Sequence, residues 1–343
     1  MVTSKRILVT GGAGYVGSHV VIALLQQGWA VTVLDDLSCG HRQAIPESID
    51  FIRSSLSERG KLDQVFASRD IRALVHLAGA AYVEESVQHP EKYYRTNVAD
   101  GLTLLETAVA HGVEQFVFSS SCTVYGKPEK LPVTETSPLA PVNPYGRTKL
   151  TFEQMLQDLG DARGMGWVAL RYFNAAGADP HGRIGEDHDP EPHLIPRILR
   201  SVSLRRGAGE SGEPLKVYGS DYATRDGTCV RDYVHVADLA DAHVKALDYL
   251  GHNGRPRAFN LANGRGFSVL EVIEACRKVT GEEIPYELSD RRPGDAAELI
   301  GDAQSAADVL GWSPAYSGLK AIVETAWRWH STHPNGYGGD GLR

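Results

Sequence analysis

The chain of 343 residues is 42% hydrophobic and 23% charged, the composition of a soluble globular protein with two domains or one large α/β unit. Its net charge of −8 argues against nucleic acid and anionic membrane surfaces as partners, and no apolar run approaches the roughly 20 residues that cross a bilayer. The four scattered cysteines form no C-x-x-C pair, and the short apolar start lacks a signal-peptide pattern, so we expect a cytoplasmic protein without disulfides.

Five short apolar runs predict strands in the first half of the chain: RILVT (6–10), AVTVL (30–34), ALVHLAG (73–79), FVFSSS (116–121) and WVALRYF (167–173). Continuous apolar runs of this kind suit strands buried on both faces of a parallel sheet. Helical spacing of apolar residues occupies 15–28, 91–112 and 145–159. The first two of these segments end in Gly28 and Gly112, which suit left-handed caps. This alternation predicts an α/β fold with a doubly wound parallel sheet over residues 1–176.

The pattern changes after Gly177. Residues 178–196 are rich in Pro, His and Asp without any period, which indicates a long functional loop or a crossing between domains. Helical patterns return at 236–250, 268–280 and 319–331. We expect residues 177–335 to form a smaller mixed α/β domain, with segments near 230–262 returning to the first domain and a flexible tail at 336–343.

A glycine-rich turn, VTGGAGYVGSHV, follows the first predicted strand and opens the first helix. Gly12, Gly14 and Gly17 match G-x-G-x-x-G, and Gly11, Gly14 and Gly17 match G-x-x-G-x-x-G. Glycines let the backbone approach a pyrophosphate at the N-terminus of a helix. Asp35 ends the second strand 18 residues after Gly17, where a carboxylate accepts hydrogen bonds from ribose and repels a 2′-phosphate. The turn therefore predicts binding of NAD in preference to NADP.

The stretch NPYGRTKL (143–150) places Tyr145 and Lys149 four residues apart, on one face of a helix. That spacing alone does not distinguish a catalytic pair from a surface contact. Together with the glycine turn and FSSSCTVYG (118–126), it resembles the extended short-chain dehydrogenase/reductase superfamily, and within it the UDP-glucose 4-epimerase family. Further similar stretches, such as LRYFNAAGADPHG, GTCVRDYVHVADLADAH and RRPGDAAELIGD, extend the resemblance from residue 6 to about residue 315.

The resemblance implies an NAD-dependent epimerase that inverts C4 of a UDP-sugar through a 4-keto intermediate, with tightly bound NAD regenerated each turnover. It implies a Rossmann NAD domain over 1–176, a UDP-sugar domain over 177–335, and a homodimer that pairs through helices near 91–111 and 145–159. The implied catalytic residues are Ser121, Thr123, Tyr145 and Lys149. The implied cofactor-binding residues are Gly11, Gly14, Tyr15, Val16, Gly17, Asp35, Asp36, Leu37, Ser38, Ser55, Leu56, Leu77, Ala78, Gly79, Ala81, Thr96, Asn97, Ser119, Tyr145, Lys149, Tyr172 and Phe173.

The implied substrate-binding residues are Ser121, Tyr145, Asn174, His193, Leu194, Val217, Tyr218, Arg231, Arg292, Asp295 and Leu299. The two arginines would hold the diphosphate and Tyr218 would stack on the base. Three cofactor positions depart from the family pattern: Ala81 replaces a lysine, Ser55 an aspartate and Thr96 an asparagine. These departures affect how tightly NAD is held. Leu299 stands where the family gates bulky C2 substituents, and it leaves activity on N-acetylated sugars open.

For Tyr145 to act as a base near pH 7, its pKa must fall by roughly 3 units, about 4 kcal/mol. One cation about 5 Å away supplies roughly 3.3 kcal/mol at an effective dielectric near 20. We therefore expect Lys149 nearly to suffice, with the positive nicotinamide ring providing the remainder.

Several alternatives remain beside this interpretation. His181, His188 and His193 lie near Asp179, Asp187 and Asp189 in sequence, but without any known ligand spacing, so no metal is predicted. A 4,6-dehydratase would carry an Asp-Glu pair after the active-site Thr, where this chain has SSCTVYG. A 4-epimerase of UDP-N-acetylglucosamine or UDP-xylose/arabinose stays open, as does a catalytically silent NAD-binding regulator.

Overall fold

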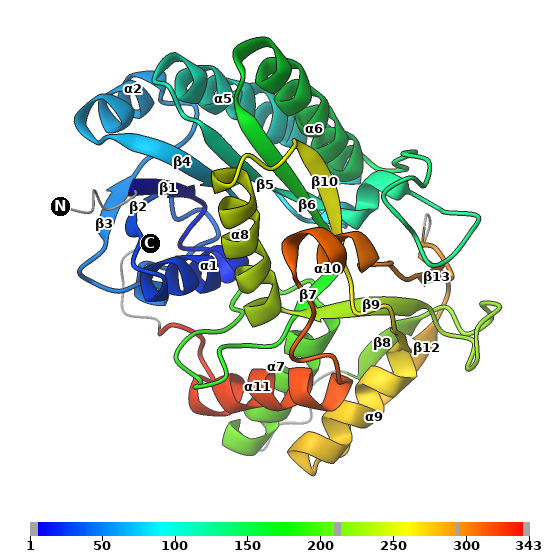
Figure 1. Ribbon diagram of the computed structural model, residues 1–343. Coiled ribbons are helices and arrows are strands. Elements are labelled where there is room, and N and C mark those ends of the chain that lie inside the picture. Colours follow the sequence, from blue (N-terminus) through cyan, green and yellow to red (C-terminus); the bar gives the residue numbers. More distant parts are fainter. Residues whose placement is uncertain (1–5, 209–213, 293–294, 339–343) are drawn as a thin grey trace.

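The computed structural model describes residues 6–208, 214–292 and 295–338. A seven-stranded sheet lies between two helical layers, and a smaller lobe lies beyond the carboxyl ends of its strands (Figure 1). The strands are β1 (Arg6–Thr10), β2 (Ala30–Asp35), β3 (Asp50–Arg53), β4 (Ile71–His76), β5 (Gln115–Ser121), β6 (Gly166–Tyr172) and β10 (Arg257–Leu261). Their order is β10-β6-β5-β4-β1-β2-β3, and every pairing is parallel. The predicted doubly wound sheet is confirmed.

Helices cover both faces of this sheet. On one face lie α1 (Tyr15–Gln26) and α8 (Val236–Gly251), and on the other lie α2 (Arg59–Ser68), α5 (Gly101–Ala110) and α6 (Pro144–Arg163) (Figure 1). Short segments complete this part: η1 (Arg42–Ala44), α3 (Val83–Gln88), α4 (Pro90–Tyr93), the π-helical η2 (Tyr94–Asp100), η3 (Cys122–Tyr125) and α10 (Gln304–Leu310). Among the helices in the described part of the chain, none is long and apolar enough to cross a membrane.

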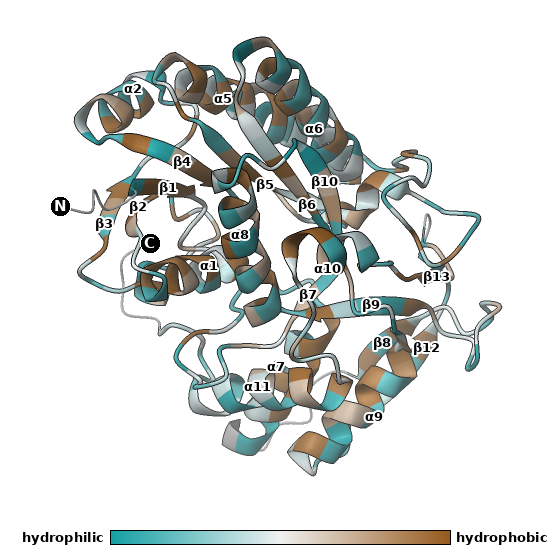
Figure 2. Ribbon diagram, viewed as in Figure 1, coloured by the Kyte–Doolittle hydropathy of each residue, from teal (hydrophilic) through white to brown (hydrophobic). Residues whose placement is uncertain are grey.

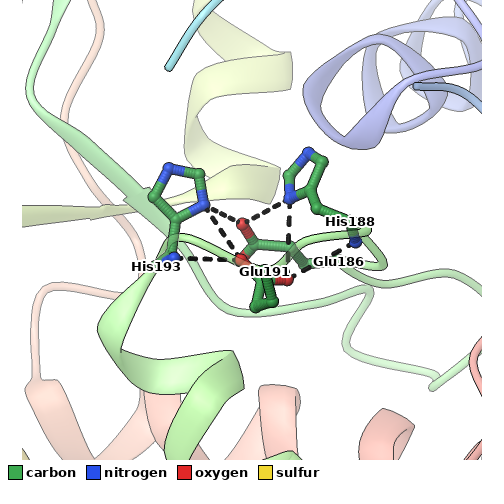
Figure 3. A group of neighbouring side chains, drawn as sticks. All are labelled: Glu186, His188, Glu191 and His193. Atoms are coloured by element: carbon green, nitrogen blue, oxygen red, sulfur yellow. Dashed lines mark hydrogen bonds and ion pairs between the residues drawn. The ribbon is translucent and has the colours of Figure 1, made fainter. Parts of the chain in front are cut away.

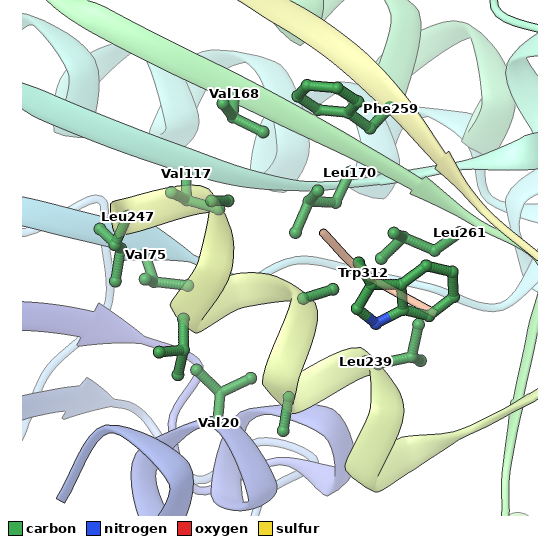
Figure 4. Close-up of a cluster of buried hydrophobic side chains, with 14 of the residues drawn as sticks. Val20, Val75, Val117, Val168, Leu170, Leu239, Leu247, Phe259, Leu261 and Trp312 are labelled. Carbon is green, nitrogen blue, oxygen red and sulfur yellow. The ribbon is translucent and has the colours of Figure 1, made fainter. Parts of the chain in front are cut away.

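Alternation along the strands divides the core between the two faces of the sheet. Phe116 and Phe118 of β5 pack with Phe152 of α6 on one face. Val117 points to the other face, where it joins Val20, Leu239 and their neighbours from α1 and α8 (Figure 4). Figure 2 shows largely hydrophobic β1, β2 and β4 beside helices that carry residues of both kinds. The apolar runs were therefore correctly interpreted as strands buried on both faces.

Among the described residues, the smaller lobe contains two short sheets and three helices. One sheet joins β7 (Asn174–Ala176), β9 (Val230–His235), β11 (Gly266–Ser268) and β13 (Glu298–Leu299), and the other joins β8 (Leu215–Tyr218) to β12 (Tyr286–Ser289). The helices α7 (Leu194–Ala208), α9 (Val269–Thr280) and α11 (Leu319–Thr332) pack together around a core of their own. After β9, the chain returns to the main sheet through α8 and β10.

The C-terminal end contacts two distant loops. The Tyr337 hydroxyl donates to the Gly185 carbonyl and accepts from the Gly185 N–H, both at 3.0 Å, and its ring stacks on His41 at 4.9 Å between centroids. The Tyr337 N–H donates to Asp187 at 3.0 Å. Of the predicted flexible tail at 336–343, residues 339–343 lie outside the described residues.

Candidate active site

The glycine turn lies where the strand order reverses, between β1 and β4. From β1 the chain proceeds outward to β2 and β3, and then returns to β4 on the other side of β1. At such a point the carboxyl ends of the strands leave a crevice that binds ligands in open α/β sheets. The backbone N–H groups of Leu77 and Ala78 donate to the Thr10 carbonyl at 2.9 and 3.0 Å, which joins the two loops that line the crevice.

Steric contacts explain why glycines occupy this turn. Gly11 has φ +73, and a Cβ there would lie 2.5 Å from the Ala78 backbone nitrogen. A Cβ on Gly17 would lie 2.0 Å from the Gly11 carbonyl oxygen. Gly14 caps the N-terminus of α1 without any side-chain hydrogen bond. The start of α1 is therefore bare backbone, which fits the pyrophosphate of a dinucleotide.

Asp35 fastens the second cofactor loop to the glycine turn. Its two carboxylate oxygens accept hydrogen bonds from the Ala13 and Leu37 N–H groups, each at 2.9 Å. Burial raises the pKa of this carboxyl, and the two N–H donors act in the opposite direction. Asp36 accepts from the Ser38 N–H at 2.9 Å. Asp35 thus sits at the end of β2 with lone pairs left for a ribose, as predicted for NAD.

Asn97 links three segments instead of lying free beside the cofactor crevice. Its side chain accepts from the Ala80 N–H at 2.8 Å and donates to the Ala80 carbonyl at 3.0 Å and to Thr148 of α6 at 3.1 Å. A Cβ on Gly79 would lie 2.9 Å from the Asn97 oxygen. Asn97 therefore positions the loop after β4. The other predicted cofactor residues lie at or just after the carboxyl ends of β3, β4, β5 and β6, or in η2. They are Ser55, Leu56, Leu77, Ala81, Thr96, Ser119, Tyr172 and Phe173.

The predicted catalytic residues converge at the carboxyl end of β5. Ser121 ends that strand, and its Oγ accepts from the Thr123 N–H at 3.2 Å and from the Thr123 hydroxyl at 3.0 Å. Tyr145 lies in the first turn of α6, where Ser121 is close enough to lower the pKa of its phenol. The cap explains this placement, because Asn143 accepts from the Gly146 N–H at 2.8 Å and Pro144 occupies the first turn.

Lys149 lies one turn after Tyr145 and is buried with it. Its Nζ donates to the Ser119 carbonyl at 2.8 Å and lies 5.8 Å from the centroid of the Tyr145 ring. The Ser119 hydroxyl is 2.5 Å from that of Tyr172 on the neighbouring strand. Burial lowers the pKa of Lys149 to about 8, against the opposing effect of Glu153.

The expected electrostatics of Tyr145 need a correction. Burial raises the pKa of Tyr145 above its ordinary value, and the effect of Ser121 in the opposite direction only partly offsets this. The expectation that Lys149 nearly suffices is wrong, because it counted the attraction of the ammonium and omitted the cost of burying a phenolate. A lower pKa needs further positive charge at the site.

Sequence reasoning missed a buried ion pair beneath this centre. Glu153 of α6 accepts hydrogen bonds from Arg171 of β6 at 2.5 and 3.0 Å and from the Ser120 hydroxyl. Arg171 also donates to the Tyr125 hydroxyl at 3.0 Å, which in turn donates to Asn260 of β10 at 2.7 Å.

The predicted substrate residues form two groups in the smaller lobe. The Arg292 guanidinium lies 4.0 Å from the centroid of the Tyr218 ring, so the two side chains are stacked. Arg231 lies 3.4 Å from Asp295, and in the small sheet it pairs with Leu299. Val217 is buried in β8, Asn174 begins β7 and Leu194 begins α7. His193 instead turns its Nδ1 toward Glu186, at 2.5 Å.

Arg231, which lies with Asp295 and Leu299, acts electrostatically on a residue of the main lobe. Burial raises the pKa of the Cys122 thiol to about 12, and the charge of Arg231 acts on the same thiol in the opposite direction. Cys122 immediately follows Ser121 at the carboxyl end of β5, so Arg231 of the smaller lobe acts electrostatically on a neighbour of the predicted catalytic serine.

Comparisons with known proteins agree with this geometry. Residues 7–262 match the model of the NAD dependent epimerase/dehydratase family. A UDP-glucose 4-epimerase of Halalkalibacterium halodurans is 49% identical over 331 residues, 96% of this chain and 97% of the relative. The UDP-glucose 4-epimerase from Brucella ovis in complex with NAD is similar with a TM-score of 0.91, 44% identity and coverage of 95% and 98%. The enzyme from Bifidobacterium longum in complex with NAD+ and UDP is similar with a TM-score of 0.90, 38% identity and coverage of 96% and 99%.

Proposed function

The chain belongs to the NAD-dependent epimerase/dehydratase family, and from this premise we propose that it interconverts UDP-glucose and UDP-galactose by inverting C4 of the hexose. The observation that supports the proposal is the proximity of Ser121, Tyr145 and Lys149 at the edge of the parallel sheet that also carries the glycine turn. Near full-length similarity to UDP-glucose 4-epimerases supports this reaction within a family that also contains dehydratases.

Inversion at C4 proceeds through oxidation, because that carbon bears no acidic hydrogen. Hydride transfer from C4 to bound NAD⁺ and back is the chemistry that the cofactor supplies. Tyr145 takes the proton of the C4 hydroxyl as the carbonyl forms, and it returns that proton when the carbonyl is reduced from the other face. The flat C4 of the keto sugar is what permits both faces to react.

Ser121 is placed to donate a hydrogen bond to the Tyr145 oxygen or to the reacting oxygen of the sugar. Because its Oγ already accepts two hydrogen bonds from Thr123, its own proton is directed outward as a donor. A donor to the phenolate oxygen favours the ionised form, which agrees with the direction in which Ser121 acts on the pKa of Tyr145. Lys149 adds a fixed positive charge below the ring.

The smaller lobe holds the nucleotide. Arg231 and Arg292 carry the forked donors that suit a diphosphate, and Tyr218 offers the ring face on which a base stacks once Arg292 moves off it. The same lobe determines which UDP-sugar is accepted. Leu299 is buried beside Arg231, and a leucine there leaves UDP-N-acetylglucosamine and UDP-pentoses as further candidates.

A copy of the same chain is the partner we infer. Tyr94, Val98 and Leu102 follow one another at four-residue intervals along η2 and α5, within the helices predicted to pair. They are exposed or half-exposed, and they belong to no hydrophobic cluster of the described residues. The cytoplasmic location stays a prediction.

Turnover of UDP-galactose tests the proposal. The purified protein, without added NAD, should form UDP-glucose, and Tyr145→Phe should lower the rate at least about 10²-fold, because a general base contributes that much. Tyr286→Phe is the control, because that side chain is exposed on β12. NAD released on denaturation should be equal in all three proteins.

Two results would contradict the proposal. Wild-type protein that holds NAD but converts no UDP-sugar is a silent binder. Near-normal turnover by Tyr145→Phe removes the assigned base. A panel of UDP-galactose, UDP-N-acetylgalactosamine and UDP-pentoses then ranks the possible substrates.

A further inference from the structure

The loop between β7 and α7 brings four chemically matched side chains together (Figure 3). They are Glu186, His188, Glu191 and His193, and one ligand atom from each lies within 4.8 Å of the others. His188 Nδ1 is 3.2 Å from Glu186 and 3.6 Å from Glu191, and His193 Nδ1 is 2.5 Å from Glu186 and 3.4 Å from Glu191. The sequence pattern E-x-H-x-x-E-x-H thus converges on one point.

The carboxylates that gather here are not those expected from the sequence. Asp179 is paired with Arg183, and Asp187 lies beside His41 and accepts from the Tyr337 N–H. The sequence drew attention to aspartates near the histidines, whereas the carboxylates that lie beside His188 and His193 are those of Glu186 and Glu191. No metal was predicted, because the histidines and aspartates have no known ligand spacing.

The charge of the two buried carboxylates in this cluster is balanced only when both histidines are protonated. The Glu186 and Glu191 side chains are only 4% and 5% exposed. Within the described residues, their ion pairs involve histidines alone, and no lysine or arginine reaches either carboxylate. Burying two negative charges is costly unless positive charge compensates them, and a single divalent cation would supply both compensating charges.

The donor atoms select the kind of cation. Two imidazole nitrogens and two carboxylate oxygens suit zinc, whereas magnesium and calcium prefer oxygen alone. In a tetrahedral site with bonds of about 2.1 Å, neighbouring ligands are about 3.4 Å apart. Three of the four contacts above are already close to that spacing, and only His193–Glu186 has to widen, by about 0.9 Å. We propose that Glu186, His188, Glu191 and His193 bind one Zn²⁺ ion.

The location gives the ion a structural role. The His188 ring lies edge-on to Tyr15 and Tyr82, with centroid separations of 6.3 and 5.8 Å. The Tyr15 hydroxyl donates to the Gly177 carbonyl at 2.7 Å, at the start of the same loop. A Zn²⁺ ion cross-links residues 186–193 and fastens the loop that leads into α7 beside the first turn of α1. This role does not depend on the proposed epimerase activity.

Zinc binding by the full chain is the first test. Protein treated with EDTA and freed of the chelator is titrated with ZnCl₂, and bound metal is counted by mass spectrometry after gel filtration. We expect one ion per chain and a higher melting temperature with zinc but not with MgCl₂. Wild-type protein that retains less than about one fifth of an ion per chain refutes the site, and the four groups are then an ion-pair network.

Two variants locate the ion. Glu191→Gln keeps an oxygen that accepts from the His193 N–H, now at 3.0 Å, but removes the ligand charge. It should weaken zinc binding at least about tenfold, with unchanged circular dichroism. His181→Gln is the matched control, because His181 is exposed on the same loop outside the cluster. Equal zinc affinity in all three proteins places the metal elsewhere and overturns the proposal.

Discussion

At the scale of single residues, burial disfavours the charged forms of both Tyr145 and Lys149. Burial raises the pKa of Tyr145 and lowers that of Lys149 to about 8, so each group resists the charge that the proposed base needs. At 5.8 Å from the ring centroid, the ammonium still stabilises the phenolate by about 3 kcal/mol at an effective dielectric near 20. Lys149 therefore contributes to the ionisation of Tyr145 without determining it alone.

Lys149→Met tests this contribution while preserving the length of the side chain. We expect the kcat for UDP-galactose to fall at least about 10²-fold. The rate should also keep rising to a higher pH than in the wild type, because loss of a nearby cation raises the pKa of Tyr145. A pH series of initial rates measures both effects.

Lys245→Met on α8 is the control, because that half-buried lysine pairs only with Asp241, at 3.9 Å. Its pH profile should follow the wild type. If Lys149→Met changes kcat but leaves the profile in place, the lysine orients the substrate and does not tune the base.

At the scale of elements, α6 is held against the sheet by the ion pair of Glu153 and Arg171. Both side chains are 7% exposed, so removing one charge leaves the other buried without a partner. Glu153→Leu should lower the free energy of unfolding by about 3–5 kcal/mol. Urea denaturation followed by circular dichroism measures this loss.

Two further variants complete this comparison. Glu153→Leu/Arg171→Met should recover most of the stability, because a buried ion pair is readily replaced by apolar groups. Glu106→Leu removes the ion pair of Glu106 with Arg59, whose atoms are 3.0 Å apart and whose side chains are about half exposed. Its loss should lower the free energy of unfolding by less than about 1 kcal/mol. A Glu153→Leu loss as small as that of Glu106→Leu would show that the pair does not hold α6.

The elements that the sequence predicted well are those with strong local signals. The strands at 6–10 and 116–121 are apolar on both faces, and the turn before α1 is specified by glycines that admit no Cβ. Strands β3 and β10, DFIR and RAFNL, were not predicted, because short mixed runs become strands only through pairing with β2 and β6.

The residues of the candidate site also differ in whether a local sequence pattern or tertiary packing brings them together. Helical spacing predicts that Tyr145 and Lys149 lie on one face of a helix, whereas Arg171 of β6 meets Glu153 only because α6 packs against that strand. The four residues from Glu186 to His193 required the path of a loop that has no period. Contacts set by tertiary packing leave little trace in a single sequence.

At the scale of the whole molecule, buried neutral histidines lower stability in acid. Burial lowers the pKa of His243 to about 4 and those of His76 and His235 to about 3. Lys149 acts on His76 in the same direction, and His19 does so on His235, where Asp179 opposes it. Since the ordinary pKa is near 6.5, the unfolded chain binds more protons below that pH. Stability should fall as the pH drops from about 6.5 towards 4, by up to about 1.4 kcal/mol per pH unit for each histidine.

His243→Met isolates one of these groups. Its Nδ1–H donates to the Leu239 carbonyl one turn earlier in the same helix, at 2.8 Å, and its Nε2 is buried without a hydrogen-bond partner among the described residues. The slope of unfolding free energy against pH between about pH 6 and pH 4.5 should therefore fall by about 1.4 kcal/mol per pH unit, which corresponds to one proton fewer taken up on unfolding. His252→Met, on the exposed end of the same helix, should leave that slope unchanged. Parallel curves for all three proteins would exclude a role for His243 in acid unfolding.

Assembly is the last property at this scale, and we expect it to depend on the apolar stripe of Tyr94, Val98 and Leu102. Tyr94 is 43% exposed, and none of the three packs into a core cluster of the described chain. A second copy that covers this stripe would bury apolar area and place α5 and α6 at an interface between two molecules. Val98→Glu/Leu102→Glu should therefore give a monomer in sedimentation experiments at concentrations where the wild type is a dimer. Leu204→Glu, at a side chain 58% exposed on α7, should stay dimeric. A wild type that sediments as a monomer, or a double variant that stays dimeric, would show that this face is not where two chains meet.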